Sequence, residues 1–341
     1  MNGALLLVHE PEAACRERLR RDGFGEDEAV EISSYLAQST DIQADLPALA
    51  EACASRELAF RAVELDDAAK ALAAADPHTG LVWTLTDGIA YFRGGAAPAL
   101  ARLHGLRTVG SDDSAFALCQ DKFRSGAVLG ALGLPVPTAG LARNGRWIAP
   151  PPRSPRGWFV KPNRLGAKIG IWEDSHCQSE ADALALSRRI FERYRDDAIV
   201  QAYVPGRNAR ASYLDAEAGG GTQPLDVRFV DSGGDFQAMA DSMALYGETA
   251  VAAQAAPMLA EVPAADAETV RSIADRLMAG VGVRDVFSMD LRIEEGGRVH
   301  LIEFEVCPGL PCFDFRAYCR GKWAMSLADA MACAAAARLR S

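Results

Sequence analysis

Three carboxylates near the C-terminal end of the chain have types and spacing that suit a metal site. Asp290 lies in one predicted strand, 286–293, and Glu303 and Glu305 lie in the next, 298–306, with a Glu-Glu-Gly-Gly turn between them. Side chains two residues apart share one face of a strand, so Glu303 and Glu305 point the same way. Asp290 joins them if it pairs opposite Glu303. Three such carboxylates repel one another unless a cation lies between them, and hard oxygen ligands suit Mg²⁺.

A solvent-exposed acidic strand face is the alternative interpretation of this hairpin. The next residues favour the metal site, because the second strand runs at once into Pro308-Gly309. A solvated hairpin has no need of such a turn. A turn whose backbone amides face a metal can instead bind an anionic reactant.

Two lysines upstream have surroundings that suit phosphate binding. Lys122 begins a predicted helix, and Lys161 lies in a predicted strand, 158–162, within the run Val-Lys-Pro. This strand continues into a loop that contains Gly166, and we predict a second strand over Ile169–Glu173. Glycine lets a loop backbone approach an anion closely. Each stretch alone is a weak signal, and either lysine alone is equally well a surface residue, but their order along the chain strengthens the case.

These stretches, in this order, resemble the ATP-grasp ligases of the D-alanine–D-alanine ligase branch. The resemblance covers roughly residues 111–314 and rests on Asp290 followed by Glu303-x-Glu305-x-x-Pro-Gly, on the Val-Lys-Pro strand with its glycine loop, and on a Gln-Asp-Lys-Phe helix start. The family usually has Asn at the position of Glu305. The resemblance implies ATP and Mg²⁺ as cofactors, with two Mg²⁺ ions held by Asp290, Glu303 and Glu305 and with Mn²⁺ as an expected substitute.

The resemblance also implies which residues contact ATP. Lysines and the glycine loop would hold the phosphates, while backbone groups of Ala202 and Val204 would read the adenine. The family generally has Glu where this chain has Gln201 and Asn208, and a small hydroxyl residue where it has Lys168, so we expect Lys168 to supply a charge-assisted contact instead. The implied set is Lys122, Lys161, Gly166, Ala167, Lys168, Gly170, Gln201, Ala202, Tyr203, Val204 and Asn208.

One departure from the family pattern concerns the reacting groups. D-alanine–D-alanine ligases usually carry Arg two residues before the first metal ligand, and this chain has Ser288 there. Acyl transfer develops an oxyanion that needs a cation. We therefore expect Arg292, on the same strand face, to act in catalysis, as we expect of Lys168. A salt bridge between Arg292 and Glu303 or Glu305 is the alternative.

Four residues are expected to contact substrate. Gly309 offers the backbone of the Pro-Gly turn. Asp314 stands where dipeptide-forming members of the family carry small hydroxyl residues for a carboxylate, and an aspartate suits an amine better. His9 ends the first predicted strand, 4–9, and Glu10 follows it, near the position where the family places a residue that binds an amino group. These differences point away from D-alanyl-D-alanine itself as the product.

The order of predicted elements indicates an α/β chain. Strands alternate with helices in the first third, which predicts a parallel sheet covered on both faces, and 341 residues suit two or three subdomains. The resemblance implies the ATP-grasp fold, with an N-terminal parallel-sheet domain (1–112), a small central ATP-binding domain (113–204) and a C-terminal metal-binding domain (205–341). Residues 231–263 have no clear period and are expected to form a long irregular segment.

The composition excludes several classes of protein. A net charge of −10, from 36 basic and 46 acidic residues, argues against a nucleic-acid-binding surface. None of the eight cysteines has C-x-x-C spacing, no stretch is apolar enough to cross a bilayer, and the first residues do not have the pattern of a signal peptide. We expect a cytoplasmic protein with reduced thiols. Its expected partners are small-molecule substrates rather than nucleic acid or a membrane, and a homodimer is left open.

Together these features predict an ATP-dependent ligase. It would activate a carboxylate, an amino acid or another small acid, as an acyl phosphate and capture it with an amine, giving an amide, ADP and phosphate. A specialised biosynthetic role is expected. The alternatives are an ATP-grasp carboxylase or kinase-like enzyme that stops at a phosphorylated intermediate, and a nucleotide-binding regulatory protein. The complete set of three carboxylates favours an enzyme.

Overall fold

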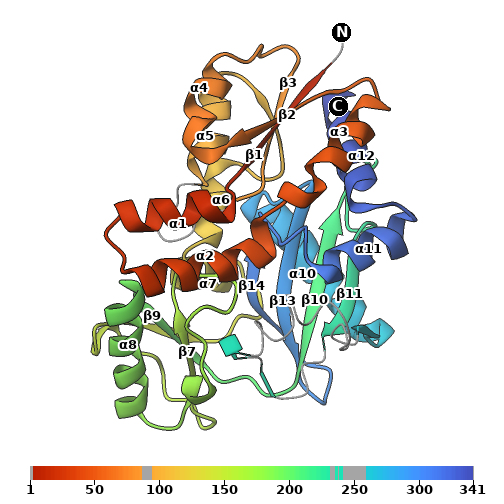
Figure 1. The fold of residues 1–341 in the computed structure, drawn as a ribbon. Helices are drawn as coiled ribbons and strands as arrows, with labels where there is room; N and C mark the ends of the chain where they lie inside the picture. The colour runs from red at the N-terminus through yellow and green to blue at the C-terminus, as the bar shows by residue number, and fades with distance from the viewer. Residues whose placement is uncertain (1–2, 87–93, 231–234, 237, 241–258, 341) are drawn as a thin grey trace, which may run out of the picture.

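The computed structural model describes residues 3–86, 94–230, 235–236, 238–240 and 259–340. Three sheets organise these residues, and helices flank each sheet (Figure 1). Most of the segment 231–263, which we expected to be irregular, lies outside the described residues. In the part of the chain that is described, no helix is both long and apolar enough to span a membrane.

The first sheet is parallel, with strand order β2-β1-β3-β4. Strands β1 and β3 are buried along nearly their whole length, which is the pattern of a parallel sheet covered on both faces. The predicted alternation of strands and helices is confirmed. The elements are β1 (Ala4–His9), α1 (Glu12–Arg21), α2 (Glu26–Thr40), α3 (Leu46–Ala54), β2 (Ala59–Glu64), α4 (Ala68–Ala73), β3 (Gly80–Thr84), α5 (Ala96–Leu103) and β4 (Arg107–Val109).

The central sheet is antiparallel, with strand order β6-β5-β9-β7-β8. Helix α8 covers one face with Ala183, Leu186 and Ile190, which recur at helical spacing. Asp112 and Asp121 cap two helices by accepting backbone N–H bonds. The elements are α6 (Asp113–Cys119), α7 (Lys122–Ala131), β5 (Ala139–Arg143), β6 (Arg146–Ala149), β7 (Trp158–Pro162), β8 (His176–Cys177), α8 (Glu180–Tyr194) and β9 (Ala198–Ala202).

Helices α1 and α2 reach from the first sheet to the central region (Figure 1). Glu31 of α2 accepts hydrogen bonds from Arg193 at 2.6 Å and from Tyr194 at 2.8 Å, both on α8. Apolar side chains of the two helices pack around Leu165 and Ile169 of the glycine loop. The α1–α2 pair therefore fixes the loop from the N-terminal side.

The third sheet is antiparallel, with strand order β12-β11-β10-β13-β14. Helix α10 covers one face with Val270, Ile273, Ala274 and Leu277. Polar residues alternate onto the opposite face, as the two-residue period of a strand requires. The elements are β10 (Arg207–Leu214), β11 (Asp226–Val230), β12 (Leu259–Glu261), α10 (Ala264–Val281), β13 (Val286–Ile293), β14 (Val299–Glu305), α11 (Phe313–Trp323) and α12 (Leu327–Arg340).

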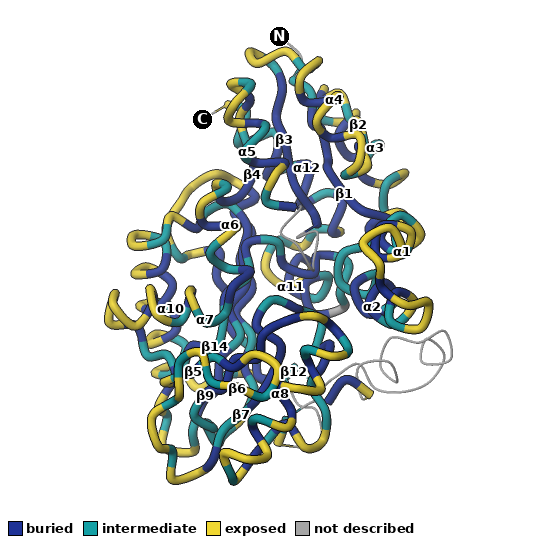
Figure 2. Tube along the Cα trace, turned by 90° about the vertical axis from the view of Figure 1, so that its left-hand side faces the viewer, coloured by how far each residue is buried: buried dark blue, intermediate teal, exposed yellow. Residues whose placement is uncertain are grey.

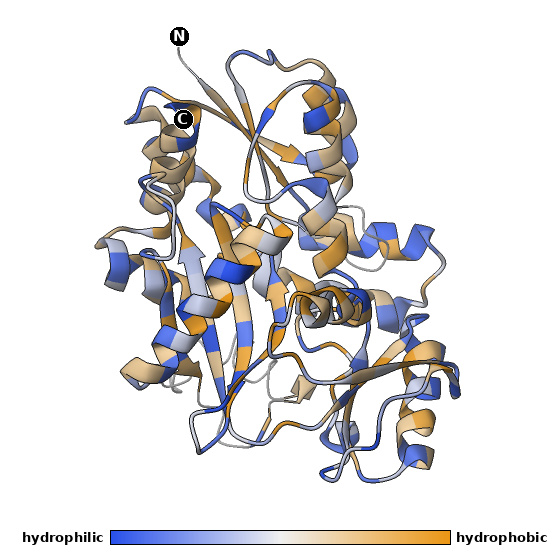
Figure 3. Cartoon of the chain, turned by 180° about the vertical axis from the view of Figure 1, so that it is seen from behind, coloured by the Kyte–Doolittle hydropathy of each residue, from blue (hydrophilic) through white to orange (hydrophobic). Residues whose placement is uncertain are grey.

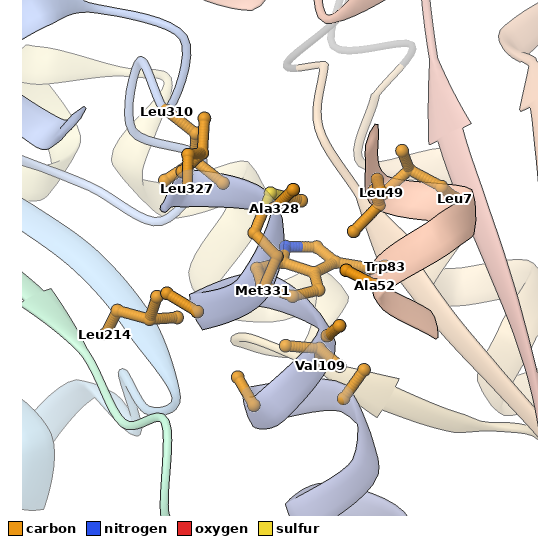
Figure 4. Close-up of a cluster of buried hydrophobic side chains, with 14 of the residues drawn as sticks. Leu7, Leu49, Ala52, Trp83, Val109, Leu214, Leu310, Leu327, Ala328 and Met331 are labelled. Atoms are coloured by element: carbon orange, nitrogen blue, oxygen red, sulfur yellow. The ribbon is translucent and has the colours of Figure 1, made fainter. Parts of the chain in front are cut away.

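The last helix, α12, joins the third sheet to the first. Met331 of α12 lies in one apolar cluster with Trp83 of β3, Leu49 of α3 and Leu214 of β10 (Figure 4). Figure 2 shows buried residues concentrated in the strands, and Figure 3 shows helices that carry both hydrophilic and hydrophobic residues. Because α12 contacts the first sheet, the division at 112 and 204 stays a prediction about the chain's domains.

Candidate active site

The three carboxylates lie together on the β13–β14 hairpin. Across the two strands Asp290 pairs with Glu303, and Ser288 pairs with Glu305. One carboxylate oxygen from each of Asp290, Glu303 and Glu305, which we call the trio, lies within 4.8 Å of the others. The pairing expected from the sequence is confirmed, and it brings all three side chains to one place.

Two lysines of the central region face Glu303. Lys161 Nζ donates to Glu303 Oε2 at 3.0 Å, and Lys122 Nζ lies 3.8 Å from the same oxygen while donating to the Leu165 carbonyl at 2.7 Å. Burial opposes the charge on Glu303, but the two lysines outweigh it and lower the pKa of Glu303 to about 2. The trio therefore keeps at least this negative charge at neutral pH.

Asp290 has the opposite shift. Of its side chain, 37% is exposed, but that surface faces a cavity rather than open solvent. Burial raises the pKa of Asp290, and the charge of Glu303 raises it further, while Arg210 and Lys161 act the other way. A cation beside the trio would relieve this repulsion.

Arg210 of β10 completes the charged cluster, and the sequence analysis missed it. It pairs opposite Asp290 in the β10–β13 ladder. Its guanidinium lies 2.9 Å from Glu305, 3.3 Å from Asp314 and 3.7 Å from Asp290, and it donates to the Ser288 hydroxyl at 3.2 Å. Burial opposes its charge, yet the surrounding carboxylates raise the pKa of Arg210 well above its ordinary value. Arg210 is a permanent cation beside the trio.

Arg292 lines the same cavity as Asp290 and Glu303 but is bonded to other residues, and its expected catalytic role stays a prediction. A bulge directly after Asp290 shifts the strand register. Beyond it the Arg292 guanidinium donates to the Val204 carbonyl at 3.1 Å, to the Asn208 side chain at 2.8 Å and to the Asp235 carboxylate at 3.0 Å. The ion pair that Arg292 forms among the described residues is with Asp235 rather than with Glu303 or Glu305, so the alternative salt bridge is wrong. The position beside the trio belongs to Arg210.

Asn163 is a second residue that the sequence analysis missed, and it fixes the two lysine-bearing elements to each other. Its side-chain oxygen accepts from the Phe123 N–H at 2.9 Å, and its backbone carbonyl accepts from the Lys122 N–H at 3.1 Å. Its side-chain amide donates to Asp121 at 3.0 Å. Because Asn163 directly follows β7, these bonds set the distance between Lys122 and Lys161.

The glycine loop lines a cavity of about 130 Å³ next to the trio, which we call the loop cavity. Ala167 and Lys168 have φ angles of 51° and 61°, so two consecutive non-glycine residues adopt the left-handed conformation. This conformation costs about 1–2 kcal/mol per residue. Lys168 lines the loop cavity, and burial lowers its pKa while Asp290 acts against that shift. The backbone thus places a cation opposite the trio, as expected for Lys168.

The loop is more compact than we predicted. Gly170 has a φ of 74°, and a Cβ there would lie 2.5 Å from Pro162, so only glycine fits. The Ile169 N–H donates to the Gly166 carbonyl at 3.0 Å, which closes a turn. The predicted strand Ile169–Glu173 is therefore wrong, and the strand that pairs with β7 on this edge is β8.

A second cavity, of about 230 Å³, lies beside β9 and is called the β9 cavity. Lys161, Lys168 and Asp290 line both cavities, so the two meet at the trio. At the other end of the β9 cavity the rings of Phe159 and Phe236 meet edge to face at 5.0 Å. The expected nucleotide residues Gln201, Ala202, Tyr203, Val204 and Asn208 all line this cavity.

Two backbone groups near β9, one N–H and one carbonyl, already form hydrogen bonds within the protein. The Ala202 N–H donates to the Thr138 carbonyl at 2.8 Å, and the Val204 carbonyl accepts from Arg292. A base in the cavity would have to be read by other backbone groups of these two residues. Tyr203 stacks on His176 with ring centroids 3.6 Å apart, which closes one wall of the region.

Gly309 lies where only a residue without a side chain fits. A Cβ there would lie 2.9 Å from Cys312 Sγ and 3.2 Å from Ser39 at the end of α2. One amide of the turn is hydrogen-bonded within the turn itself, because the Leu310 N–H donates to the Pro308 carbonyl at 2.7 Å. Gly309 lines the loop cavity, as its expected substrate role requires.

Asp314 lies on the first turn of α11 and lines the β9 cavity. It is 9% exposed, and its Oδ2 lies 3.3 Å from Arg210 Nε. Its Oδ1 is buried and has no hydrogen-bond partner among the described residues. The side chain therefore lies at the site, and its Oδ1 is available to accept a hydrogen bond from a ligand.

His9 and Glu10 were also expected to contact substrate, and the structure places them elsewhere. Both Glu10 oxygens accept from Arg18, at 2.7 and 3.0 Å, in a buried pair. Burial lowers the pKa of His9, while Glu64 and Asp41 act the other way. Neither residue lines the β9 cavity or the loop cavity. Arg18 satisfies Glu10 locally, so this carboxylate is a structural partner rather than a substrate ligand.

Known proteins share both the sequence pattern and the architecture. Residues 156–320 match the family model described as the D-ala D-ala ligase C-terminus. The D-alanine–D-alanine ligase of Geobacter sulfurreducens is 25% identical over 64% of this chain and 65% of its own length, and that of Cereibacter sphaeroides is 30% identical over 58% of each. The solved D-alanine–D-alanine ligase of Bacillus anthracis, complexed with ATP, superposes with a TM-score of 0.63 at 12% identity, covering 99% of this chain and 98% of that one.

The chain has the ATP-grasp fold of the solved D-alanine–D-alanine ligases, and residues 156–320 are similar to the C-terminal part of that family. The family match, 156–320, includes β7, the glycine loop, β9 and the complete trio hairpin. The sequence matches span 58–66% of the length of the curated relatives. The family-model match therefore covers the trio, Lys161 and the glycine loop, but not Lys122.

The trio of this ATP-grasp chain fits a divalent metal. It offers three carboxylates within 4.8 Å, and oxygen donors of this kind suit Mg²⁺. The pKa of Asp290 is raised mainly by burial and further by Glu303, and a bound cation would favour the charged carboxylate. Lys122, Lys161 and Lys168 add positive charge on the side of the trio where the two cavities meet. The site can thus hold a polyphosphate and a small anionic group side by side.

Proposed function

We propose that this chain is an ATP-dependent ligase that joins a carboxylate to an amine through an acyl phosphate. The observation that carries the proposal is the trio with Lys161, Lys122 and Arg210 around it, at the junction of two cavities. One cavity has aromatic walls that suit a nucleotide base. The other is enclosed by a glycine loop and a Pro-Gly turn, which suits phosphate and a small acid.

In the first step the substrate carboxylate would attack the γ-phosphorus of ATP, so that a carboxylate oxygen–phosphorus bond forms and ADP leaves. Lys161, Lys122 and Lys168 would hold the phosphates in line. Asp290, Glu303 and Glu305 would hold Mg²⁺, which supplies charge neutralisation for the terminal phosphates when bound. Mn²⁺ is expected to substitute for it.

In the second step the uncharged amine would attack the acyl carbon, phosphate would leave with the bonding pair of the carbon–oxygen bond, and the nitrogen would lose a proton to the departing phosphate. The carbonyl oxygen becomes an oxyanion in between and needs a fixed donor. Arg210 suits this role because its Nε is buried and makes no hydrogen bond within the described residues. Ser288, at the position where the family usually has Arg, instead accepts a hydrogen bond from Arg210.

The substrates would differ from those of D-alanine–D-alanine ligases. Asp314 lies next to Arg210 with a free acceptor, and an acidic group there disfavours a substrate carboxylate and favours an ammonium. This supports a specialised amide-forming role rather than D-alanyl-D-alanine synthesis.

Labelled substrate tests the reaction type. The full chain, Mg²⁺ and ATP are incubated with pairs of amino acids and small acids. In each pair the two members are labelled in turn with ¹⁸O in the carboxylate, and the products are identified by mass. We expect ADP, and ¹⁸O in the released phosphate. Label in AMP, or unlabelled phosphate while amide still forms, would overturn the acyl-phosphate mechanism.

A further inference from the structure

A third cavity, which we call the α11 groove, opens from the same charged cluster. It has a volume of about 200 Å³ and lies between α11 and the polar face of β10 and β11. Arg210 and Asp314 line both the α11 groove and the β9 cavity. The groove therefore adjoins the β9 cavity at Arg210 and Asp314, beside the trio, and none of the expected nucleotide residues lines it.

Small residues on α11 create this space. Asp314, Ala317, Tyr318 and Gly321 recur at helical spacing, so they present one face of α11 to the sheet. Gly321 lines the groove, and a Cβ at this exposed residue would meet no atom within 4 Å. A larger side chain at position 321 therefore has room to extend over the groove.

The strand side of the groove is a two-by-two grid of polar residues. Arg210 pairs with Arg228 and Ser212 pairs with Asp226 across β10 and β11, and all four side chains line the groove. Arg228 lies 2.9 Å from Asp226, as Arg210 lies 2.9 Å from Glu305. Both arginines are already within ion-pair distance of carboxylates, so the groove does not select an anion.

The acceptor without a partner is on Asp314. Its side chain is more than nine-tenths buried, and its Oδ1 has no hydrogen-bond partner among the described residues. Leaving a buried carboxylate oxygen without a donor costs free energy, and more than for a neutral group. A ligand ammonium at the mouth of the groove would supply that donor.

The size of the groove limits the part of the ligand beyond the ammonium. An apolar cavity of about 150 Å³ holds benzene, and this groove is larger, with Ala317, Tyr318 and Leu259 among its walls. We propose that the α11 groove binds the amine substrate, a primary amine whose ammonium contacts Asp314 and whose body has at least the bulk of a six-membered ring. This inference rests on the proposed ligase function.

Binding of two matched amines tests the groove without turnover. 2-Phenylethylamine and ethylamine, which differ by a phenyl ring, are titrated calorimetrically into the full chain with Mg²⁺ and a non-hydrolysable ATP analogue. We expect wild type to bind the larger amine at least about tenfold more tightly. Gly321→Leu fills the groove and should remove this preference. Arg320→Leu, on the exposed side of the same helix turn, should keep it.

The Asp314→Asn variant separates the ammonium contact from the apolar contact. This variant should weaken the binding of both amines, because it removes the charge that faces the ammonium. It leaves the shape of the α11 groove unchanged. A wild type that binds neither amine, or a Gly321→Leu variant that still prefers the larger one, would overturn the groove assignment. If the groove binds amines as expected but no amine supports ADP formation with any acid, the ligase proposal fails and the binding site stands.

Discussion

The trio hairpin and the turn after β1 both carry acidic residues that we expected in the active site, and they differ in where their cations come from. Glu10 is neutralised by Arg18, eight residues further along the chain, and the pair is sealed within one region. Glu303 is neutralised by Lys161, 142 residues earlier and in a different sheet. Both oxygens of Glu10 already accept hydrogen bonds, so this carboxylate cannot bind a ligand as well. The trio carries more negative than positive charge and lies where two cavities meet.

The contrast also explains why the trio is costly to the folded chain. Burial raises the pKa of Asp290 and the neighbouring charge of Glu303 raises it further, while Arg210 opposes both effects. Charged groups that repel one another or lack a partner are common in active sites, where a bound ligand supplies the missing partner. The Glu10–Arg18 pair contains no such excess. Substitutions at the two places should therefore separate activity from stability.

The largest effect is expected for Glu303→Gln, which removes a charge from the trio but keeps the size of the side chain. ADP formation should fall at least about a thousandfold, because both the metal site and the lysine contacts lose their anion. The unfolding midpoint in urea should fall, because the buried Lys161 loses its partner, but by less than in Glu10→Gln, since Glu303 is more exposed than Glu10 and its repulsion of Asp290 is also removed. Wild-type turnover by the folded variant at saturating Mg²⁺ would remove the trio from the active site.

The next largest effect should distinguish Arg210 from Arg292. Arg210→Met is expected to lower kcat about 100- to 1000-fold with little change in the KM for ATP, because a single oxyanion donor is lost. Arg292→Met should instead raise the KM for ATP, since Arg292 contacts Val204 and Asn208 on the nucleotide side.

Arg210→Lys provides the control for this pair, because it keeps the charge and should recover part of kcat. Initial rates at varied ATP give both constants. The reverse pattern, with kcat lost in Arg292→Met and retained in Arg210→Met, would restore the role that the sequence indicated for Arg292.

A smaller effect is expected at the cation side of the trio. Lys161→Ala should raise the KM for ATP and lower kcat, for a combined loss of about 10- to 100-fold in kcat/KM. Lys122→Ala should lose less, because Lys122 lies 3.8 Å from Glu303 and also bonds the Leu165 carbonyl. ATP dependence that is unchanged in Lys161→Ala would mean that the glycine loop does not hold phosphate.

The sequence predicted the trio because its geometry is local. Asp290, Glu303 and Glu305 belong to one hairpin, whose turn and two-residue period bring the side chains together without help from the rest of the fold. The boundaries of β7 and β13 could be predicted from the residues as well. The ATP-grasp fold was implied by the family resemblance, which rests on several motifs in a fixed order.

Arg210 was missed because its place depends on tertiary structure. The alternation of Ala209 and Ala211 with Arg210 and Ser212 is a strand signal, but only the β10–β13 pairing puts Arg210 opposite Asp290. Arg292 shares a strand face with Asp290, as expected, but its bonds to Val204, Asn208 and Asp235 depend on tertiary structure and could not be predicted. For Glu10, the helical position of Arg18 was not predicted, so its local partner could not be recognised.

The smallest effect on catalysis, and the clearest effect on stability, is expected for Glu10→Gln. The Arg18 and Glu10 side chains are 1% and 6% exposed, so removing one charge leaves the other buried without its partner. Breaking such a pair costs about 3–5 kcal/mol, which urea unfolding would measure, while kcat/KM for ATP should stay within about twofold of wild type at a temperature where both proteins are folded. A double variant, Glu10→Gln with Arg18→Met, should recover part of the lost stability because no buried charge remains. If Glu10→Gln instead abolishes turnover in a protein as stable as wild type, the turn after β1 takes part in substrate binding, and the distinction between locally neutralised and open carboxylates fails for this chain.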